Sequence, residues 1–262
     1  MVAIKPIITF TTVKGRRPSN EDKHNIILNI NNPNTNAKDI NFFGIYDGHG
    51  GTFVSEYLEK NLPLYYFFKK LKTPFSVEYH TKIFEHIQSK ILLDKRGYSN
   101  GSACLINIMY KYRNQIHMNF VNLGDSRAVI VYSDGKHKQI TRDHKPEDNI
   151  EKKRINDMGG SVIEDSEGIF RVGDLSLSRS FGDGDNAPYV SQVPDVFYYV
   201  VKSETKYVVM ACDGLWDVIN NNELYKLIIN YKKENKNVAV ELANEALRRG
   251  SMDNVSVIVI EF

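Results

Sequence analysis

The sequence predicts an α+β fold in which blocks of antiparallel strands are followed by helices in pairs. Short runs rich in Ile, Val, Thr and Phe, which are typical of strands, follow one another across short turns. Helix-like segments come in pairs rather than after each strand, which argues against a doubly wound sheet. The 262 residues are 42% hydrophobic and 25% charged, which is ordinary for a globular protein and excludes a disordered or fibrous chain.

Three strands and two helices are expected in the first part of the chain. The strands are Ile7–Val13, His24–Ile30 and Phe42–Tyr46. The Asn-rich stretch Asn29–Asn41 is expected to be a surface loop between the second and third strands. Helix-like segments follow over Thr52–Leu71 and Val77–Leu93, and in the second one apolar residues recur at helical spacing. The first helix should bend near Pro63, because proline cannot donate its backbone hydrogen bond.

Six more strands and three helices are expected in the rest of the chain. The strands are Ser102–Met109, Gln115–Leu123, Arg127–Tyr132, Val196–Val201, Tyr207–Cys212 and Val255–Ile260. The charged segment 144–170 is expected to be mostly loop, with a short helix around Asn149–Met158. Two helices should lie around Leu224–Tyr231 and Ala239–Leu247. The second of these ends in two arginines followed by Gly250, which are good helix stop signals.

The charge and cysteine content limit the possible partners and compartments. Lys and Arg number 34 against 32 Asp and Glu, and a net charge of +2 gives no general attraction to nucleic acid or to an anionic membrane. No apolar run approaches the roughly 18–20 residues of a membrane span, and Met1–Phe10, broken by Pro6, is too short for a signal peptide. Cys104 and Cys212 lie in apolar runs and are expected to be buried, reduced thiols. An intracellular location, in the cytoplasm, the nucleus or both, is therefore expected.

Two apolar strands are each followed by Asp and Gly. Phe42–Tyr46 leads to Asp47 and Gly48, and Tyr207–Cys212 leads to Asp213 and Gly214. A carboxylate at the end of a buried strand places an oxygen ligand at a sheet edge, and the glycine lets backbone and ion approach closely. Either pair alone could equally be a turn with a solvated Asp.

Further acidic residues stand at other strand ends and turns, and they strengthen the case for a shared acidic cleft. Glu21 and Asp22 follow Arg17 near the start of the chain, Asp125 lies in a strand-to-strand turn, and Asp253 precedes the last strand. A carboxylate-rich, oxygen-only set of ligands suits Mg²⁺ or Mn²⁺ rather than zinc.

The sequence resembles the metal-dependent serine/threonine protein phosphatases of type 2C. Eight runs carry the resemblance, in the order that the family has them: Arg17–Asp22, Asp47–Gly51, Gly101–Ala103, Leu123–Ala128, Thr141–Pro146, Leu175–Asp183, Ala211–Asp217 and Asp253–Ser256. Each run alone is weak, but eight in sequence over nearly the whole chain are specific. The resemblance implies a four-layer α/β/β/α sandwich, in which two antiparallel sheets are each covered by a helix pair and a binuclear metal site lies at one sheet edge. It also implies one catalytic domain over residues 1–262, with a variable flap at about 145–171.

The resemblance assigns the metal ligands residue by residue. Asp47 would bridge two Mg²⁺ or Mn²⁺ ions, and Glu21 and the carbonyl of Gly48 would bind one of them. Asp213 and Asp253 would bind the other ion. Asp22 would act mostly through metal-bound water. A third, weaker ion would involve Asp125, Asp213 and Asp217.

The implied reaction is hydrolysis of phosphoserine and phosphothreonine in proteins. Two nearby cations activate a bridging water as the nucleophile and neutralise charge on the phosphoryl group. Arg17 would hold the phosphate with its planar guanidinium. His49 would be the general acid for the leaving oxygen, because imidazole titrates near neutrality. Asp183 is expected only to stabilise a turn or to contact other site residues without touching the substrate.

Two alternatives come from other classes of protein. An inactive relative that binds phosphoproteins or a kinase as an adaptor should have lost acidic ligands, whereas Glu21, Asp47, Asp213 and Asp253 are all present. A metal-dependent nuclease would want a basic surface, which a charge of +2 does not provide. The expected partners are therefore phosphoserine and phosphothreonine proteins, with no nucleic acid and no membrane, and the chain is expected to be a monomer.

Overall fold

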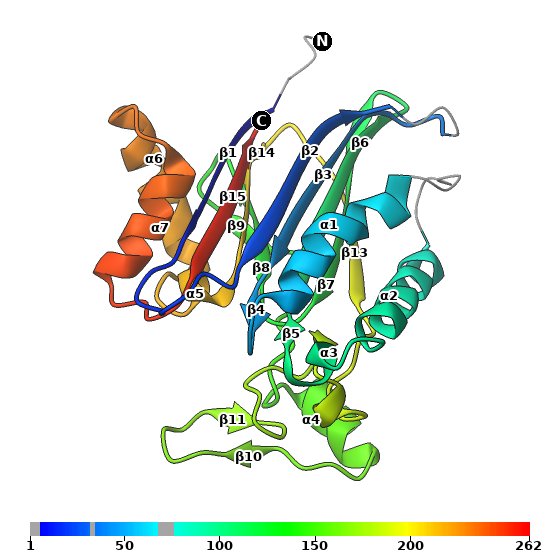
Figure 1. The fold of residues 1–262 in the computed structure, drawn as a ribbon. Coiled ribbons are helices and arrows are strands. Elements are labelled where there is room, and N and C mark those ends of the chain that lie inside the picture. The colour runs from blue at the N-terminus through cyan, green and yellow to red at the C-terminus, as the bar shows by residue number, and fades with distance from the viewer. Residues whose placement is uncertain (1–5, 32–34, 68–75) are drawn as a thin grey trace.

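Two antiparallel sheets of five strands each form the centre of the molecule (Figure 1). The computed structural model describes residues 6–31, 35–67 and 76–262. The first sheet has the order β1 (Ile7–Val13), β15 (Val255–Glu261), β14 (Thr205–Ala211), β8 (Arg127–Tyr132) and β9 (His137–Gln139). The second sheet has the order β13 (Asp195–Val200), β7 (Gln115–Leu123), β6 (Cys104–Tyr112), β3 (Lys38–Tyr46) and β2 (Lys23–Ile30).

A two-residue turn sets the register of the β6–β7 hairpin. Tyr112 pairs with Gln115, so that Arg113 and Asn114 alone form the turn. Both have positive φ, +48° and +61°, as a type I′ turn requires, and the twist of this turn matches that of the flanking strands. The pairing continues without a shift to the far end of the hairpin, which lies at the edge of the sheet that carries the functional site.

A pair of helices packs on the outer face of each sheet (Figure 1). The second sheet is covered by α1 (Phe53–Phe67) and α2 (Val77–Ile91). The first is covered by α6 (Leu224–Lys233) and α7 (Val238–Arg248). Both α6 and α7 present their buried residues at helical spacing, including Leu224 and Ile228 on α6, so that each buries one apolar stripe.

The two faces of each central strand contribute to different apolar clusters. On β3, Phe42 packs with the α1–α2 pair, whereas Phe43 faces the other sheet. On β14, Val209 packs with the α6–α7 pair and Met210 lies between the sheets. Strands buried on both faces have continuous apolar runs rather than alternation. The contacts give the order helices, sheet, sheet, helices, which is consistent with the four-layer expectation, and the α+β prediction is confirmed.

Short elements lie at one end of the two sheets and complete the fold. A small sheet joins β12 (Phe181–Gly182), β5 (Gly101–Ser102) and β4 (Gly48–His49). The flap contains α4 (Asn149–Asp157) and the hairpin of β10 (Ile163–Glu164) and β11 (Phe170–Arg171), and it lies beyond the sheet ends (Figure 1). The remaining short helices are α3 (Arg96–Ser99), η1 (Gly184–Asn186), α5 (Asp213–Trp216) and η2 (Asn221–Glu223).

Most predicted strands and helices are present, and three predictions need correction. The third strand begins at Lys38 rather than Phe42, because Ile40 and Asn41 are already buried in the sheet, so the Asn29–Asn41 loop is shorter than predicted. The predicted Ser102–Met109 strand is divided at Ala103 into β5 and β6. The charged flap segment contains a strand pair as well as its predicted helix. The part of the Thr52–Leu71 helix beyond residue 67 lies outside the described residues.

Within the described residues, no helix is both long enough and apolar enough to cross a membrane. The short apolar stretch Met1–Phe10 lies partly outside the described residues, since the description begins at Pro6. Cys104 and Cys212 are both buried and free, as predicted from their apolar surroundings.

Candidate metal centre

A cavity of about 320 Å³ opens at the sheet ends next to the flap, and it gathers most of the predicted site residues. Those in its lining are Arg17, Glu21, Asp47, Gly48, His49, Asp125, Asp213 and Asp253. The structure therefore brings together residues that are up to 236 positions apart. Asp22 and Asp217 do not line the cavity.

Strand pairing explains how the acidic residues meet. Lys23 pairs with Tyr46, so Asp22, just before β2, lies beside Asp47, just after β3. Ala211 pairs with both Arg127 and Val257, so the chain leaving β14 at Asp213 lies between the segments that enter β8 and β15. Those segments carry Asp125 and Asp253.

Asp47, Asp125 and Asp213 form one group that could hold a cation. Each offers a carboxylate oxygen, and these oxygens lie within 4.8 Å of one another. Burial raises the pKa of Asp47, and the neighbouring Asp213 charge raises it further. Burial likewise raises the pKa of Asp213, with Asp125 as the next cause. Carboxyls whose ionisation is resisted by burial and by like charges are the groups that a bound cation would stabilise.

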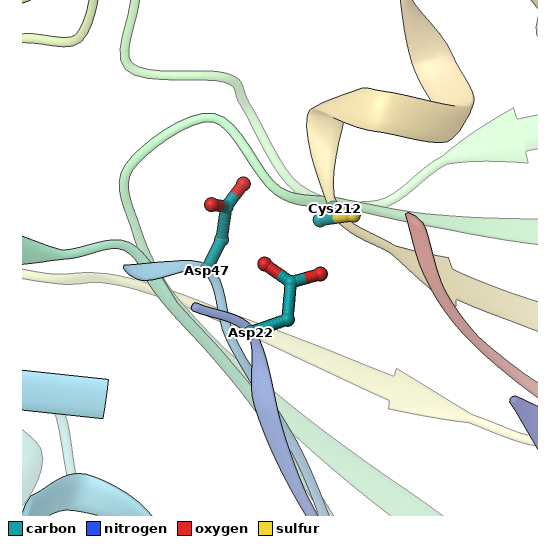
Figure 2. A group of neighbouring side chains, drawn as sticks. All are labelled: Asp22, Asp47 and Cys212. Carbon is teal, nitrogen blue, oxygen red and sulfur yellow. The ribbon is translucent and has the colours of Figure 1, made fainter. Parts of the chain in front are cut away.

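Asp22, Asp47 and Cys212 form a second group, in which two carboxylate oxygens and the cysteine sulfur lie within 4.8 Å of one another. Figure 2 shows the carboxyl groups of Asp22 and Asp47 pointing in the same direction, with Cys212 beside Asp22. Asp22 Oδ2 accepts a hydrogen bond from Ser256 Oγ at 2.6 Å, while the buried Asp22 Oδ1 has no hydrogen-bond partner among the described residues. Burial raises the pKa of Asp22 to about 6. A buried acceptor of this kind fits a position beside a cation or its water.

Cys212 belongs to the protein core rather than to a ligand set. Burial raises the pKa of the Cys212 thiol well above its ordinary value of 9.0. Its sulfur donates to the Asn254 carbonyl at 3.4 Å and accepts from the Ser256 amide at 3.1 Å. A neutral, hydrogen-bonded thiol leaves the oxygen atoms as the donors, and oxygen donors suit hard divalent cations.

Glycine is required at Gly48 so that the Glu21 segment can approach. A Cβ atom at Gly48 would lie 2.5 Å from the Glu21 carbonyl oxygen and 2.7 Å from Ser55 Oγ. That hydroxyl donates to the same carbonyl at 2.6 Å. The Glu21 side chain is oriented from the other side, because Oε2 accepts from the Gly51 amide at 2.9 Å. Gly48 and Glu21 are therefore held against each other, as a shared ion would need.

Asn254 fastens the Arg17–Asp22 segment to the last strand, a role that the sequence did not reveal. Its Nδ2 donates to the carbonyls of Lys14 and Ser19 at 2.7 and 2.9 Å. Its Oδ1 accepts from the Glu21 amide at 2.8 Å. Because the partners are more than 230 residues away, only the folded arrangement identifies this side chain as a support for the site.

Arg17 lies at the cavity rim, where it is paired with Asp253. Its Nη2 donates to Asp253 Oδ2 at 2.7 Å, and the Arg17 side chain is 56% exposed. The hydrogen bond to Asp253 raises the pKa of Arg17. The guanidinium is thus tethered beside the acidic residues by one nitrogen, and it presents a positive charge at the entrance of a cavity that is lined with negative charge.

His49 is paired with Asp183, which the sequence marked only as a supporting residue. His49 Nε2 lies 2.8 Å from Asp183 Oδ2, and Ser180 Oγ also donates to that oxygen. Burial lowers the pKa of His49, but the hydrogen bond and charge of Asp183 outweigh this effect, and the pKa is raised overall. A Cβ at Gly101 would lie 2.1 Å from Asp183 Oδ2, so the pair requires glycine there. Asp183 thus contacts His49 without lining the cavity, and its supporting role stays a prediction.

Asp125 has a partner that the sequence did not single out. Lys145 Nζ lies 2.6 Å from Asp125 Oδ2 and 3.9 Å from Asp213 Oδ2. Burial would lower the pKa of Lys145, but the charges of Asp125 and Asp213 outweigh it and raise the pKa. Asp217 is exposed and lies beside this group rather than in the cavity.

A buried charge network anchors the flap next to the cavity. Glu151 on α4 is fully buried, and its carboxylate accepts from Arg179 Nε, at 3.1 and 3.0 Å to its two oxygens, and from Ser178 Oγ at 2.9 Å. Burial would raise the pKa of Glu151, but Arg179 outweighs it and lowers the pKa to about 2. Arg179 also contacts Asp195 of β13 at 3.1 Å. The network ties α4 to the second sheet through Asp195. It also ties α4 to Ser178 and Arg179, which directly follow the cavity-lining residues 174–177.

The described residues fit a divalent cation on chemical grounds. Their donors are carboxylate and carbonyl oxygens, the type that Mg²⁺ and Mn²⁺ prefer. Carboxylate oxygens of Asp47, Asp125 and Asp213 lie within 4.8 Å of one another, and Asp22, close to Asp47, has a buried oxygen without a partner in the described chain. The acidic clusters could therefore hold metal ions.

Comparison with known proteins identifies the family. The family model "Protein phosphatase 2C" matches residues 8–255. The chain is 35% identical over 261 residues to "Probable protein phosphatase 2C 55" of Oryza sativa subsp. japonica, a match that covers 97% of this chain and 65% of that relative. It is also 35% identical over 261 residues to "Probable protein phosphatase 2C 17" of Arabidopsis thaliana, covering 97% and 88% of the two chains.

A solved structure described as a C. elegans sex-determining protein has the same fold. Its TM-score is 0.85 at 25% sequence identity, and the match covers 97% of this chain and 64% of that one. This chain spans 65% of the length of the rice relative. The family model extends over nearly all of the described fold and over the acidic residues of the cavity up to Asp253. The chain belongs to the protein phosphatase 2C family.

Proposed function

We propose that this chain hydrolyses phosphoserine and phosphothreonine in proteins with the help of two Mg²⁺ or Mn²⁺ ions. The observation that carries the proposal is the cavity itself. It combines a cluster of carboxylates, a guanidinium at its rim and an imidazole beside the cluster. These are the parts that metal-assisted phosphomonoester hydrolysis requires, and membership of the phosphatase family supports the assignment.

The ligand assignment is the one that the family resemblance implies, and it is supported by the fact that Glu21, Asp47, Gly48, Asp213 and Asp253 all line the cavity. Asp47 would contact both ions, with Glu21 and the Gly48 carbonyl on one of them. Asp213 and Asp253 would bind the other ion. Asp22, which lies beside Asp47 but does not line the cavity, would contribute through water. When bound, the two ions supply an activated water nucleophile and neutralise charge on the phosphoryl group.

Arg17 and His49 would act on the substrate directly. The Arg17 guanidinium can offer a planar pair of N–H donors to phosphoryl oxygens, which a lysine could not reproduce. Because Asp183 lies against His49 Nε2, the other ring nitrogen, Nδ1, is the one that would donate a proton to the leaving serine or threonine oxygen. The raised pKa of His49 keeps more of the imidazole protonated near neutral pH.

The wider assignments belong to the same proposal. We infer one catalytic domain over residues 1–262, acting as a monomer on phosphoproteins, with no nucleic acid and no membrane as partners. A location in the cytoplasm, the nucleus or both is in keeping with two buried, free cysteines. The flap, next to the cavity, is the segment where substrate choice would be made.

The test is release of phosphate from a phosphothreonine peptide with Mn²⁺ or Mg²⁺, with and without chelator. Asp47→Asn and Asp213→Asn should each lower the rate by about 100-fold or more, because losing a metal ligand removes several kcal/mol of charge stabilisation. Asp134→Asn, which changes an exposed turn, is the matched control and should retain full activity.

The alternative is an inactive relative that binds phosphoproteins or a kinase. It gains no support from the acidic residues, since every assigned ligand is present in the sequence. Phosphate release that ignores the chelator, or that survives in both ligand variants, would contradict the proposed mechanism. A folded chain that binds phosphopeptide but never releases phosphate would favour the adaptor.

A further inference from the structure

Lys145 places a positive charge inside the acidic group that contains Asp125. Its Nζ lies 2.6 Å from Asp125 Oδ2 and 3.9 Å from Asp213 Oδ2. The Asp125 side chain is only 3% exposed and that of Lys145 is 28% exposed. A buried carboxylate is costly unless it is paired, and among the described residues the ammonium of Lys145 pairs with Asp125.

The backbone next to Lys145 fixes this position. The turn that carries Asp125 and the residue before Lys145 exchange two hydrogen bonds. The His144 amide donates to the Gly124 carbonyl at 3.0 Å, and the Gly124 amide donates to His144 Nδ1 at 3.0 Å. The His144 carbonyl accepts from the Ser178 amide at 2.9 Å. The backbone next to Lys145 is therefore hydrogen-bonded to the turn that carries Asp125. From this position the extended Lys145 side chain reaches the Asp125 carboxylate.

A divalent ion between Asp125 and Asp213 would have to share this space with the ammonium. Like charges at contact distance repel strongly where water is largely excluded. We propose that Lys145 is the resident counter-cation of Asp125, so that a third divalent ion can bind there only by displacing it. This inference rests on the proposed function, because it concerns the position next to the two catalytic ions.

The two principal ions should be little affected by Lys145. Glu21 is oriented by the Gly51 amide, and Asp253 is paired with Arg17. Of the ligands proposed for the two ions, Asp213 forms an ion pair with Lys145, and its oxygen is 3.9 Å from the ammonium, beyond a hydrogen bond. Removing the Lys145 charge should therefore add an ion site without removing one.

The experiment counts bound Mn²⁺ by the electron paramagnetic resonance signal of the free hydrated ion during titration of the full chain. The wild type should bind two Mn²⁺ ions, as a two-metal site requires. Lys145→Met keeps the apolar stem and removes the charge, so it should bind a third ion at least about tenfold more tightly than the wild type does, since the competing cation is gone. Lys138→Met, which removes an exposed lysine of β9, is the control and should match the wild type.

Two further variants make the result decisive. Asp125→Asn in the Lys145→Met background should abolish the third ion, whereas Asp125→Asn alone should leave the wild-type count unchanged. The measurement on Asp125→Asn alone can be made even if Lys145→Met does not fold. The proposal is overturned if the wild type already binds three ions and the third is unaffected by Lys145→Met. It is equally overturned if the wild type binds three ions and Asp125→Asn loses the third.

The outcomes also separate this proposal from the proposed function. A chain that binds two ions and releases phosphate, but whose Lys145→Met variant gains no third ion, overturns the role of Lys145 and leaves the phosphatase intact. A wild type that binds no Mn²⁺ at all overturns both.

Discussion

The His49–Asp183 pair shows how one contact can tune a reactive side chain. Asp183 is 4% exposed and holds His49 Nε2 at 2.8 Å. An anionic partner favours the imidazolium form, and the pKa of His49 is accordingly raised despite burial. In the proposed reaction the protonated form is the active one, so Asp183 acts through His49 and is a positioning residue rather than a catalytic one.

Replacement of the two residues should give different kinetic signatures. His49→Ala should slow hydrolysis of phosphothreonine by about 100-fold, the usual contribution of a general acid, but should slow p-nitrophenyl phosphate much less, because that leaving group needs no proton. Asp183→Asn should lower the pKa of His49, so the activity should fall at a lower pH than in the wild type. The measurement is the pH dependence of kcat for both substrates.

Equal slowing of both substrates in His49→Ala would remove His49 from the acid role. An unshifted pH profile in Asp183→Asn would show that Asp183 supports only the local backbone. Asp185→Asn, two residues further along in the neighbouring turn, is the control for Asp183.

Some of these residues could be predicted from sequence and others could not. Asp47 and Asp213 follow apolar strands directly, and a strand end is a local signal that places a carboxylate at a sheet edge. Asp183 and Lys145 act on residues 134 and 20 positions away, so nothing in their own surroundings reveals the partner. Asn254 is likewise defined by contacts across the whole chain.

At the scale of elements, the α1–α2 pair contains a buried histidine that should respond to pH. His80 on α2 is fully buried, and its Nδ1 lies 2.8 Å from Tyr66 Oη on α1. Burial lowers the pKa of His80 from 6.5 to about 4. Below pH 6.5 the unfolded chain therefore takes up a proton that the folded chain resists, and stability is lost as the pH falls from 6.5 to 4.

The expected loss from His80 is about 3 kcal/mol over that interval, from about 1.4 kcal/mol per pH unit. His80→Gln should flatten the dependence of the free energy of unfolding on pH between 6.5 and 4, as measured by urea denaturation. His86→Gln, on the exposed face of the same helix, should leave the slope of the wild type. A His80→Gln slope equal to that of the wild type would show that His80 is protonated within the fold.

The element boundaries show where local patterns stop being informative. The α4 helix was predicted within one residue, and in the structure Asp148 caps its start by accepting from the amides of Ile150 and Glu151. The flap strands β10 and β11 were missed, since each has two residues and gains its pairing from the other. Two-residue strands carry too little periodicity to be distinguished from a loop.

At the scale of the whole molecule, the small net charge of the chain conceals an uneven distribution of its charged residues. The net charge is +2, yet the strand pairings place Asp22, Asp47, Asp125, Asp213 and Asp253 at one edge. Sequence composition averages over this concentration, whereas the fold creates it. Without metal ions, the carboxylates of the cavity repel one another, and the rest of the fold must hold them together.

This repulsion predicts that a ligand variant is more stable than the wild type when metal is removed. The pKa of Asp213 is raised above its ordinary value of 3.8, first by burial and then by Asp125. Stability from this group is therefore complete below pH 3.8 and is lost as the pH rises through the folded-state pKa, so at neutral pH in chelator it is a cost. Asp213→Asn removes that cost and should raise Tm, by about 2–4 °C for each kcal/mol relieved.

Adding Mn²⁺ should reverse the order. An ion at 100 times its dissociation constant stabilises the wild type by about 2.7 kcal/mol, while Asp213→Asn, having lost a ligand, should gain less. Thermal unfolding followed by circular dichroism, in chelator and in Mn²⁺ at pH 7.5, measures both effects, with Asp134→Asn as the surface control. If Asp213→Asn is the less stable protein in chelator, the carboxylates are held by contacts stronger than their mutual repulsion, and the cavity does not depend on cations for its charge balance.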